Sequence, residues 1–341
     1  MPTLADVAKR AGVSTATVSR VLSNTPYFTE NTKQKVLAAA DALGYVPHSA
    51  ARALASGRTN IVAFVYPYIE EGIADDPAIT QILQGVEDEA RCHGYHVLMV
   101  SPEVNADEED LRFRNIIASR NIDGSIILPR AVEYEIASIP ETHKTPYVTI
   151  GYAASDQYVA SDGFAGGALL VRHLIELGHK RIGIISAYEH HAYIADRIMG
   201  MQAEAEKHGL IFDELPRYQG NFTMPSGSQA LEAMLYHHPD LTGIIAVNDR
   251  MAIGAIQKAR ELGYNVPEDL SICGHDNIPL ASLFVPSLTT VDHHAAEIGR
   301  HSMRMLLDIM QGNKPEAVRL PVTLCVGQST AAPRKNVEII S

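Results

Sequence analysis

Side chains suited to bind a small molecule follow two of the apolar runs in this sequence. Asn248 and Asp249 follow the run GIIAV, and Asp276 follows the run SICGH. Ligands of parallel α/β sheets bind beyond the carboxyl ends of the strands, so these side chains are expected near a cleft. Asp249 has an equally good alternative role as the cap of the helix that follows it.

Arg197 and Phe222 add a guanidinium fork and an aromatic face to this set. Together with Asp276 and Asn248 they would supply directed hydrogen bonds and stacking area. That combination suits a sugar or a nucleobase, and the residues alone leave both classes open. We therefore predict a small-molecule site made of Arg197, Phe222, Asn248 and Asp276.

No signature of an enzyme or a metal site is present in the sequence. It has no GxSxG elbow and no Walker loop, and DGFAGG at 162–167 lacks dinucleotide-loop spacing, so its glycines are expected to permit close helix packing. Adjacent histidines diverge, and no histidine doublet has a Cys or carboxylate at ligand spacing. We predict no catalysis, cofactor or metal. The doublets are His190-His191, His237-His238 and His293-His294.

Three cysteines, far apart and in apolar segments, predict buried reduced thiols without a disulfide framework. They are Cys92, Cys273 and Cys325. No apolar run reaches membrane-spanning length, and the acidic Asp6 stands where a signal peptide would be apolar. We therefore expect a cytoplasmic protein without a membrane partner.

Beyond residue 59, apolar runs alternate with helical stretches. This alternation predicts an α/β core of two sub-domains, each a doubly wound parallel sheet. The expected strands are 61–66, 96–100, 125–128, 147–150, 182–186, 243–247 and 270–273. The expected helices are 79–93, 108–120, 195–208, 226–237 and 250–262, with Glu108-Glu109-Asp110 as a solvated helix start.

Ahead of this core the sequence predicts a small all-α headpiece. Two short helices, 4–11 and 14–22, meet at a Gly-Val turn, as in a helix-turn-helix unit. Thr3 with Asp6 resembles a capping box, and Ser14 is a good cap for the second helix. Thr29 is expected to cap a third helix, 30–43, ended by Gly44. The apolar side of that helix is predicted to contain Val36, Leu37, Ala40 and Leu43.

The second helix, STATVSRVL, has one apolar side that can pack inward. The outward set is small, polar and singly basic, and Arg20 offers the bidentate fork suited to guanine. An ordinary surface helix would look similar. The charge distribution favours a DNA-binding role, because residues 1–58 contain seven Lys and Arg against three Asp and Glu, a net charge of +4, whereas the remainder is −16. The outward residues are Thr15, Ala16, Ser19 and Arg20.

Two segments, TLADVAKRAGVSTATVSRVL and VLAAADALGYVPHSAARALASG, resemble the headpiece and hinge of LacI/GalR-type bacterial transcription regulators. The body is similar in VNDRMAIGAIQKARELGYNVPEDLSICGHDN and PSLTTVDHHAAEIG. The resemblance covers residues 3–330. It implies a helix-turn-helix headpiece, a hinge helix, and a dimeric core like that of periplasmic sugar-binding proteins, which binds a small effector.

The resemblance assigns roles residue by residue. Thr15, Ala16 and Arg20 match base-reading positions, and Leu54 matches the hinge leucine that wedges into the minor groove. The effector set named above matches effector-contacting positions, and Asp162 and Asp249 match landmarks near the cleft. The full predicted DNA-binding set is Thr15, Ala16, Thr17, Ser19, Arg20, Tyr27 and Leu54.

The sequence departs from the family pattern at four places. His48 and Ser23 stand where Asn is frequent, and Ala78 after Pro77 stands where sugar-responsive members have an aromatic residue. His275 replaces an aromatic or similar residue, which raises the expectation of a pH-sensitive effector response. The tail RKNVEIIS is too short for a heptad zipper, so tetramers of that kind are not expected.

The resulting hypothesis is a ligand-controlled repressor that binds a pseudo-palindromic operator as a homodimer, with a sugar more expected than a purine as effector. The alternatives are a solute-binding protein without a DNA role, a carbohydrate-acting enzyme on the same core, and a regulator with a nucleobase corepressor. The predicted domains are the helix-turn-helix unit 1–46, the hinge and linker 47–59, the core 60–333 and the tail 334–341.

Overall fold

The computed structural model describes residues 2–22, 28–45, 57–66, 76–101, 111–128, 138–151, 156–188 and 191–334. Several predictions concern residues outside these ranges. They are Ser23, Tyr27, His48, Leu54 and the rest of the predicted hinge up to residue 56, the acidic run 108–110, His190 and the tail after residue 334. By its internal contacts the chain divides into two compact units, residues 1–61 with 121–123, and the rest.

The headpiece consists of α1 (Leu4–Ala11), α2 (Thr15–Leu22) and α3 (Glu30–Leu43). The three starts follow the predicted capping. Thr3 and Asp6 form a capping box, Oγ of Ser14 accepts from the backbone N–H of Thr17 at 3.1 Å, and Thr29 caps α3. Each cap satisfies a backbone N–H that lacks a helical partner. The prediction of three short capped helices is confirmed.

A small apolar core holds these helices together. It contains Val7, Ala8, Val18, Val21, Val36, Ala39 and Ala40. The prediction that Leu37 packs inward is wrong, because 41% of Leu37 is exposed and Ala39 is buried in its place. The buried side of α3 therefore follows positions 36, 39 and 40, the helical spacing of three and four.

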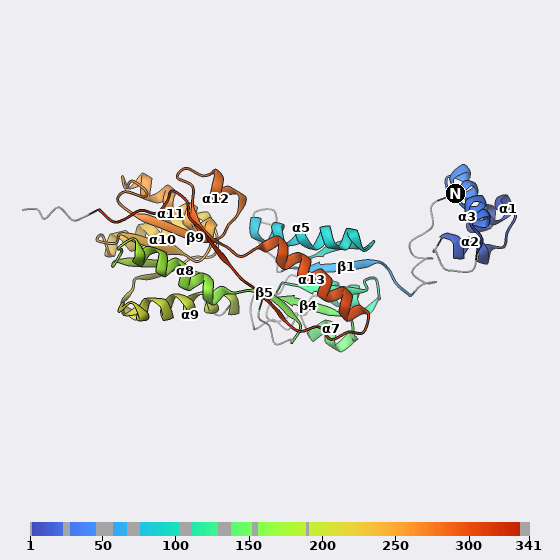
Figure 1. Ribbon diagram of the computed structural model, residues 1–341, viewed down its shortest axis with the longest axis horizontal. Coiled ribbons are helices and arrows are strands. Elements are labelled where there is room, and N and C mark those ends of the chain that lie inside the picture. Colours follow the sequence, from blue (N-terminus) through green and yellow to red (C-terminus); the bar gives the residue numbers. More distant parts are fainter. Residues whose placement is uncertain are drawn as a thin grey trace, which may run out of the picture. The chain divides into compact units, whose positions relative to one another are not determined.

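The first lobe of the core is a six-stranded sheet in the order β11-β5-β4-β3-β1-β2. Its pairs β1/β3, β3/β4, β4/β5 and β5/β11 are parallel. The strands are β1 (Ile61–Val65), β2 (His96–Val100), β3 (Gly124–Ile127), β4 (Tyr147–Ile150), β5 (Tyr158–Ser161) and β11 (Val318–Leu320). The helices are α5 (Pro77–Cys92), α6 (Leu111–Ala118), α7 (Ser138–His143) and α13 (Ala295–Met310), with α5 and α13 side by side (Figure 1).

The second lobe is a six-stranded sheet in the order β12-β10-β9-β8-β6-β7, parallel except for the pair β10/β12. The strands are β6 (Ile182–Ser186), β7 (Arg217–Gln219), β8 (Gly243–Ala246), β9 (Ser271–Asp276), β10 (Thr289–Asp292) and β12 (Thr323–Cys325). The helices are α8 (Gly163–Glu176), α9 (Ala192–Lys207), α10 (Met224–His237), α11 (Asp249–Glu261) and α12 (Pro279–Leu283). The pairs α8/α9 and α10/α11 pack closely (Figure 1).

The chain passes between the lobes three times, from β5 to α8, from β10 to α13 and from β11 to β12. The prediction of two parallel α/β sub-domains is confirmed. The sequence patterns missed the strands β5, β7, β10, β11 and β12 and the helices α7, α8, α12 and α13. Most of these are short elements or lie next to the crossings.

Glycines let α8 and α9 approach each other closely, as the run at 162–167 predicted. A Cβ on Gly167 would overlap the carbonyl oxygen of Arg197, and one on Gly200 would overlap that of Phe164. This close approach fixes the position of α9, the helix that contains Arg197.

Candidate functional site: a ligand cavity and a nucleic-acid helix

Helix α2 presents the predicted outward residues. Thr15, Ala16 and Arg20 are exposed, Thr17 and Ser19 are half-buried, and Val18 and Val21 lie in the headpiece core. This arrangement matches what a recognition helix needs, a rigid inner side and small or basic side chains that can approach base edges.

A cavity of 340 Å³ lies between the two lobes of the core. This volume is at the lower end of the range for small-molecule sites, about 300–1,000 Å³. All four predicted effector residues line it: Arg197, Phe222, Asn248 and Asp276. The first lobe contributes residues that include Asp76, Ala78, Ile79 and Ile82.

Arg197 and Asp276 form a buried ion pair at one wall of the cavity. Nη2 of Arg197 lies 3.1 Å from Oδ1 of Asp276, with the two side chains 8% and 10% exposed. Nη1 of Arg197 donates to the carbonyl oxygen of Val247. Burial opposes ionisation of Asp276, but the charge of Arg197 and two imidazole hydrogen bonds outweigh it and hold the pKa of the carboxyl well below its ordinary value. Asp276 is therefore a carboxylate that can accept hydrogen bonds from a ligand.

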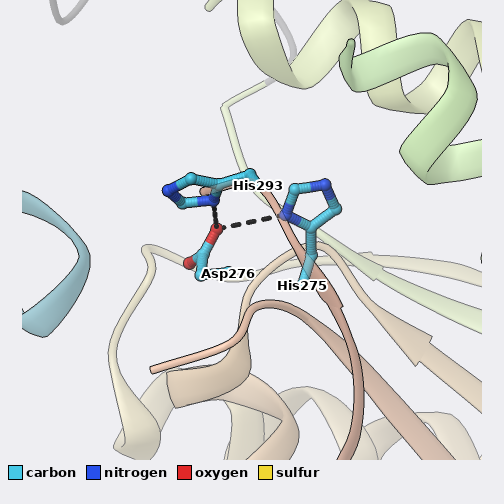
Figure 2. Close-up of side chains that lie close together, drawn as sticks. All are labelled: His275, Asp276 and His293. Atoms are coloured by element: carbon cyan, nitrogen blue, oxygen red, sulfur yellow. Dashed lines mark hydrogen bonds and ion pairs between the residues drawn. The ribbon is translucent and has the colours of Figure 1, made fainter. Parts of the chain in front are cut away.

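Two histidines contact the same carboxylate (Figure 2). Nδ1 of His275 and Nδ1 of His293 each lie 3.2 Å from Oδ1 of Asp276. The sequence predicted no carboxylate at ligand spacing from His293, and this prediction is wrong. Parallel pairing of β9 with β10 brings Asp276, at the end of β9, next to His293, which follows β10. Burial, and then the charge of Arg197, lower the pKa of His275 to about 3. The imidazole is thus neutral near pH 7, contrary to the expected pH-sensitive response from this residue.

The atoms of His275, Asp276 and His293 that could coordinate a metal ion lie within 4.8 Å of one another, close enough to hold such an ion. Two features argue against a metal there. The guanidinium of Arg197 already occupies the carboxylate oxygen. A His275 that ligated through Nδ1 would carry its hydrogen on Nε2, which is buried without a hydrogen-bond partner in the described residues, whereas metal-bound imidazoles almost always donate that hydrogen. The arrangement suits a hydrogen-bonded cluster better.

The cap of α11 is Asn248 and not Asp249. Asn248 caps α11, since its Oδ1 accepts from the backbone N–H of Met251 at 3.0 Å, and its Nδ2 donates to the carbonyl oxygen of Phe222. Asp249 is fully buried and accepts from Thr290 Oγ1 and from the backbone N–H of Ile278. The capping role offered for Asp249 is therefore wrong, and Asp249 instead joins the start of α11 to β10 and to the segment that follows β9.

Burial, together with the neighbouring charge of Asp276, raises the pKa of Asp249 to about 8. Asp162, the other landmark, does act as a cap, and its Oδ1 accepts from the N–H of Ala165 at 2.9 Å at the start of α8. Neither Asp162 nor Asp249 lines the cavity.

Phe222 belongs to an aromatic wall that the sequence patterns missed. Its ring stacks on that of Tyr193 at 6.3 Å between centroids and lies 6.0 Å from Tyr188 and 5.8 Å from His191. All four rings line the cavity. The signal in the sequence was the aromatic density of residues 188–193, which follow the strand β6 as Asn248 follows β8.

The cysteines are free, but only Cys273 is buried. Cys92 is exposed at the end of α5 and Cys325 is half-buried, so the expectation of three buried thiols is wrong for these two. None of the described helices combines the length and the hydropathy that a membrane span requires.

The sequence of the chain is similar to those of known bacterial regulators. A model of bacterial regulatory proteins of the lacI family matches residues 3–48, and one of a periplasmic binding protein-like domain matches residues 171–330. The HTH-type transcriptional repressor CytR of Escherichia coli strain K12 is 34% identical over 316 residues, which are 91% of this chain and 90% of CytR.

Solved structures agree. The lac repressor dimer bound to operator and the anti-inducer ONPF matches with a TM-score of 0.86 and 26% identity, over 97% of this chain and 99% of the repressor chain. A complex of the transcriptional regulator CelR with cellobiose matches with a TM-score of 0.74 and 29% identity, over 96% and 100% of the two chains.

A helix-turn-helix headpiece on a two-lobed ligand-binding core defines a DNA-binding transcriptional regulator, and the relatives are regulators rather than enzymes. The chain belongs to the LacI family of bacterial regulatory proteins, as a DNA-binding transcriptional repressor.

Proposed function

We propose that this repressor is controlled by a sugar that binds in the cavity between the lobes and contacts Arg197, Phe222, Asn248 and Asp276. The observation that carries the proposal is the convergence of these four residues on one cavity although they are spread over 80 positions of the chain. An ionised Asp276 accepts from hydroxyl groups, and the ring of Phe222 covers an apolar face of the ligand.

A sugar is favoured by the carboxylate, which needs donors from the ligand, and by the similarity to the CelR–cellobiose complex. The aromatic wall of Tyr188, His191, Tyr193 and Phe222 favours a second candidate, a flat nucleobase that stacks on these rings. The nucleobase would act at the same site, so one ligand screen separates the two.

The proposed output is binding of a pseudo-palindromic operator by a homodimer. In each subunit α2 lies in the major groove, where Arg20 reads a guanine and Thr15 and Ala16 make close contacts. Thr17, Ser19 and Tyr27 add to this interface, and Leu54 wedges into the minor groove. The two half-sites would then lie about one helical turn or more apart.

The effector would control operator binding through the chain crossings that connect the two lobes. A ligand held by both lobes changes the angle between them, and this changes the separation of the two hinge segments, 47–59, in the dimer. Formation of the hinge helices at the operator would respond to that separation. The coupling is reciprocal, so operator must change effector affinity by the same factor.

A thermal-shift screen of the intact chain against sugars, sugar phosphates and nucleobases tests the ligand class. Compounds that raise the melting temperature are then titrated into a complex with an operator selected from a random DNA library. The proposal predicts that a sugar shifts operator affinity, whereas a response to nucleobases alone would reject the sugar. A variant that lacks residues 1–58 is expected to lose operator binding and keep ligand binding, and DNA binding by that variant would reject the headpiece role.

A further inference from the structure

The two carboxylate oxygens of Asp276 have unequal surroundings. Oδ1 receives three hydrogen bonds, from Arg197 Nη2 at 3.1 Å, His275 Nδ1 at 3.2 Å and His293 Nδ1 at 3.2 Å. Among the described residues no donor reaches Oδ2, and Figure 2 shows this oxygen pointing away from both rings. Because Asp276 lines the cavity, Oδ2 is the oxygen left for a ligand.

His275 differs from the other two donors because it does not line the cavity. Its side chain is fully buried, and it is seated against α8 at Gly166. A Cβ on Gly166 would lie 2.7 Å from Nε2 and 3.2 Å from Cδ2 of the ring. Tight packing and the hydrogen bond to Asp276 therefore define its orientation.

Packing alone does not require a histidine at this position. Nε2 of His275 is buried without a hydrogen-bond partner in the described part of the chain, which is unfavourable for a polar atom. A phenylalanine side chain would fill similar space without burying an unpaired polar atom. The polar atom that is used is Nδ1, so the advantage of the imidazole is its bond to Asp276.

The geometry also assigns the tautomer. The carboxylate oxygen can only accept, so the ring must carry its hydrogen on Nδ1 and leave Nε2 bare. A bare Nε2 is a hydrogen-bond acceptor without a donor. A protonated Nε2 in the same place would be a buried donor without an acceptor, which is the rarer case in proteins.

We propose that His275 is a positioning residue of the effector site, whose neutral Nδ1–H tautomer holds Oδ1 of Asp276 and so directs Oδ2 into the cavity. The inference rests on the proposed role of Asp276 in effector binding. His275 acts through Asp276 and does not touch the effector.

The tautomer can be measured without any effector. Two-dimensional ¹H–¹⁵N spectra of the full chain labelled with ¹⁵N-histidine report which ring nitrogen is protonated, and His275→Asn identifies the signal. We expect a neutral Nδ1–H tautomer at pH 7, with a shifted Nδ1 resonance in Asp276→Asn. An Nε2–H tautomer, an imidazolium, or displacement of this signal by one equivalent of Zn²⁺ would overturn the proposal, the last by showing a metal site instead.

Ligand affinity supplies the second readout. Intact variants are titrated calorimetrically with cellobiose, D-ribose and adenosine, and the compound that binds the parent chain is used. His275→Phe keeps the ring and loses the donor, so binding should weaken about tenfold or more. His275→Asn places an amide N–H near the position of Nδ1 and should stay within about threefold of the parent chain. His179→Asn is the matched control, since His179 is also buried but bonds Thr242 and Ala331 in another part of the lobe.

Different results would contradict the positioning role of His275 and the effector role of Asp276. If Asp276→Asn abolishes binding while His275→Phe binds like the parent chain, the positioning role is wrong and the effector site stands. If none of the three compounds binds the parent chain, or Asp276→Asn binds as well as it does, the effector assignment fails, and the ring spectra still decide the bond from His275 to Asp276.

Discussion

The guanidinium of Arg197 and the carboxylate of Asp276, 79 positions apart in the sequence, meet at 3.1 Å in the cavity wall. The bond joins α9 to the end of β9 within the second lobe. Each partner has a further role, since Arg197 also donates to the carbonyl oxygen of Val247 and Asp276 accepts from two imidazoles. The cavity wall is thus a connected polar network, and removal of one member leaves other buried groups unpaired.

Arg197→Ala should destabilise the protein more than removal of both charges. Truncation leaves the buried Asp276 carboxylate without its main counter-charge, and such losses cost about 3–5 kcal/mol. Arg197→Met combined with Asp276→Asn removes both charges and should recover most of that loss. Urea unfolding of the three proteins measures the difference. A single variant that is as stable as the double variant would contradict the importance of this pair.

Asp276→Asn should remove the effector response while operator affinity without effector is kept. A hydrogen bond to a charged group contributes about 1.5–3 kcal/mol, so effector affinity should fall about tenfold to a hundredfold. Calorimetric titration and operator-binding curves measure the two properties. Asp292→Asn is the control, because Asp292 ends the neighbouring strand β10 but does not line the cavity. Equal losses in both variants would show a general effect on folding.

The sequence was informative where a pattern is local. Helix caps such as Thr3, Ser14 and Thr29 were found because they act within four residues of their own helix. Apolar runs of four or five residues found the long strands, whereas three-residue strands such as Arg217–Gln219 are too short to show alternation. The crossings between lobes gave no signal, since they depend on strand order and not on local spacing.

The site was predicted only in part for the same reason. Arg197, Phe222, Asn248 and Asp276 were found through strand ends and family resemblance, and they do line one cavity. The neighbourhood of His293 and Asp276 depends on the register of β9 against β10, which pairs Asp292 with Asp276. That Asn248 and not Asp249 caps α11 depends on side-chain directions at the start of that helix, where either residue type can cap.

Gly166→Ala should weaken effector binding through His275. The new Cβ would lie 2.7 Å from Nε2, so the ring must move and its bond to Asp276 must lengthen. Overpacking of this kind costs about 1–3 kcal/mol of stability. Gly243→Ala is the comparison, because its Cβ would meet a methyl group of Leu174 at 3.1 Å in the same lobe. Both variants should unfold at lower urea concentration, and only Gly166→Ala should also lose effector affinity. Unchanged effector affinity in Gly166→Ala would show that the position of His275 does not influence effector binding.

The buried His275 should make the stability of the protein fall in acid. Its folded pKa of about 3 is below the value of about 6.5 for an exposed histidine, so the unfolded chain binds a proton that the folded chain does not. Stability from this group is therefore complete above pH 6.5 and is lost as the pH falls towards 3, by about 2 kcal/mol at pH 5. His275→Asn lacks this contribution, while Asp249 and the other titrating groups remain. The difference in unfolding free energy between the two proteins, measured from pH 8 to pH 5, should change by that amount, and a constant difference would mean that His275 is protonated in the folded state.

Arg20→Ala and Lys33→Ala should weaken operator binding in different ways. Arg20 is exposed on α2, and loss of a bidentate contact to guanine should cost about 1–3 kcal/mol at one base pair of each half-site and relax the preference there. Lys33, on α3 beside Glu30, is expected to contact a phosphate. Its loss should weaken all sequences about equally and reduce the salt dependence by about one ion. Selection from an operator library at two salt concentrations separates the two patterns, and the same uniform weakening in both variants would remove Arg20 from the residues that read the operator sequence.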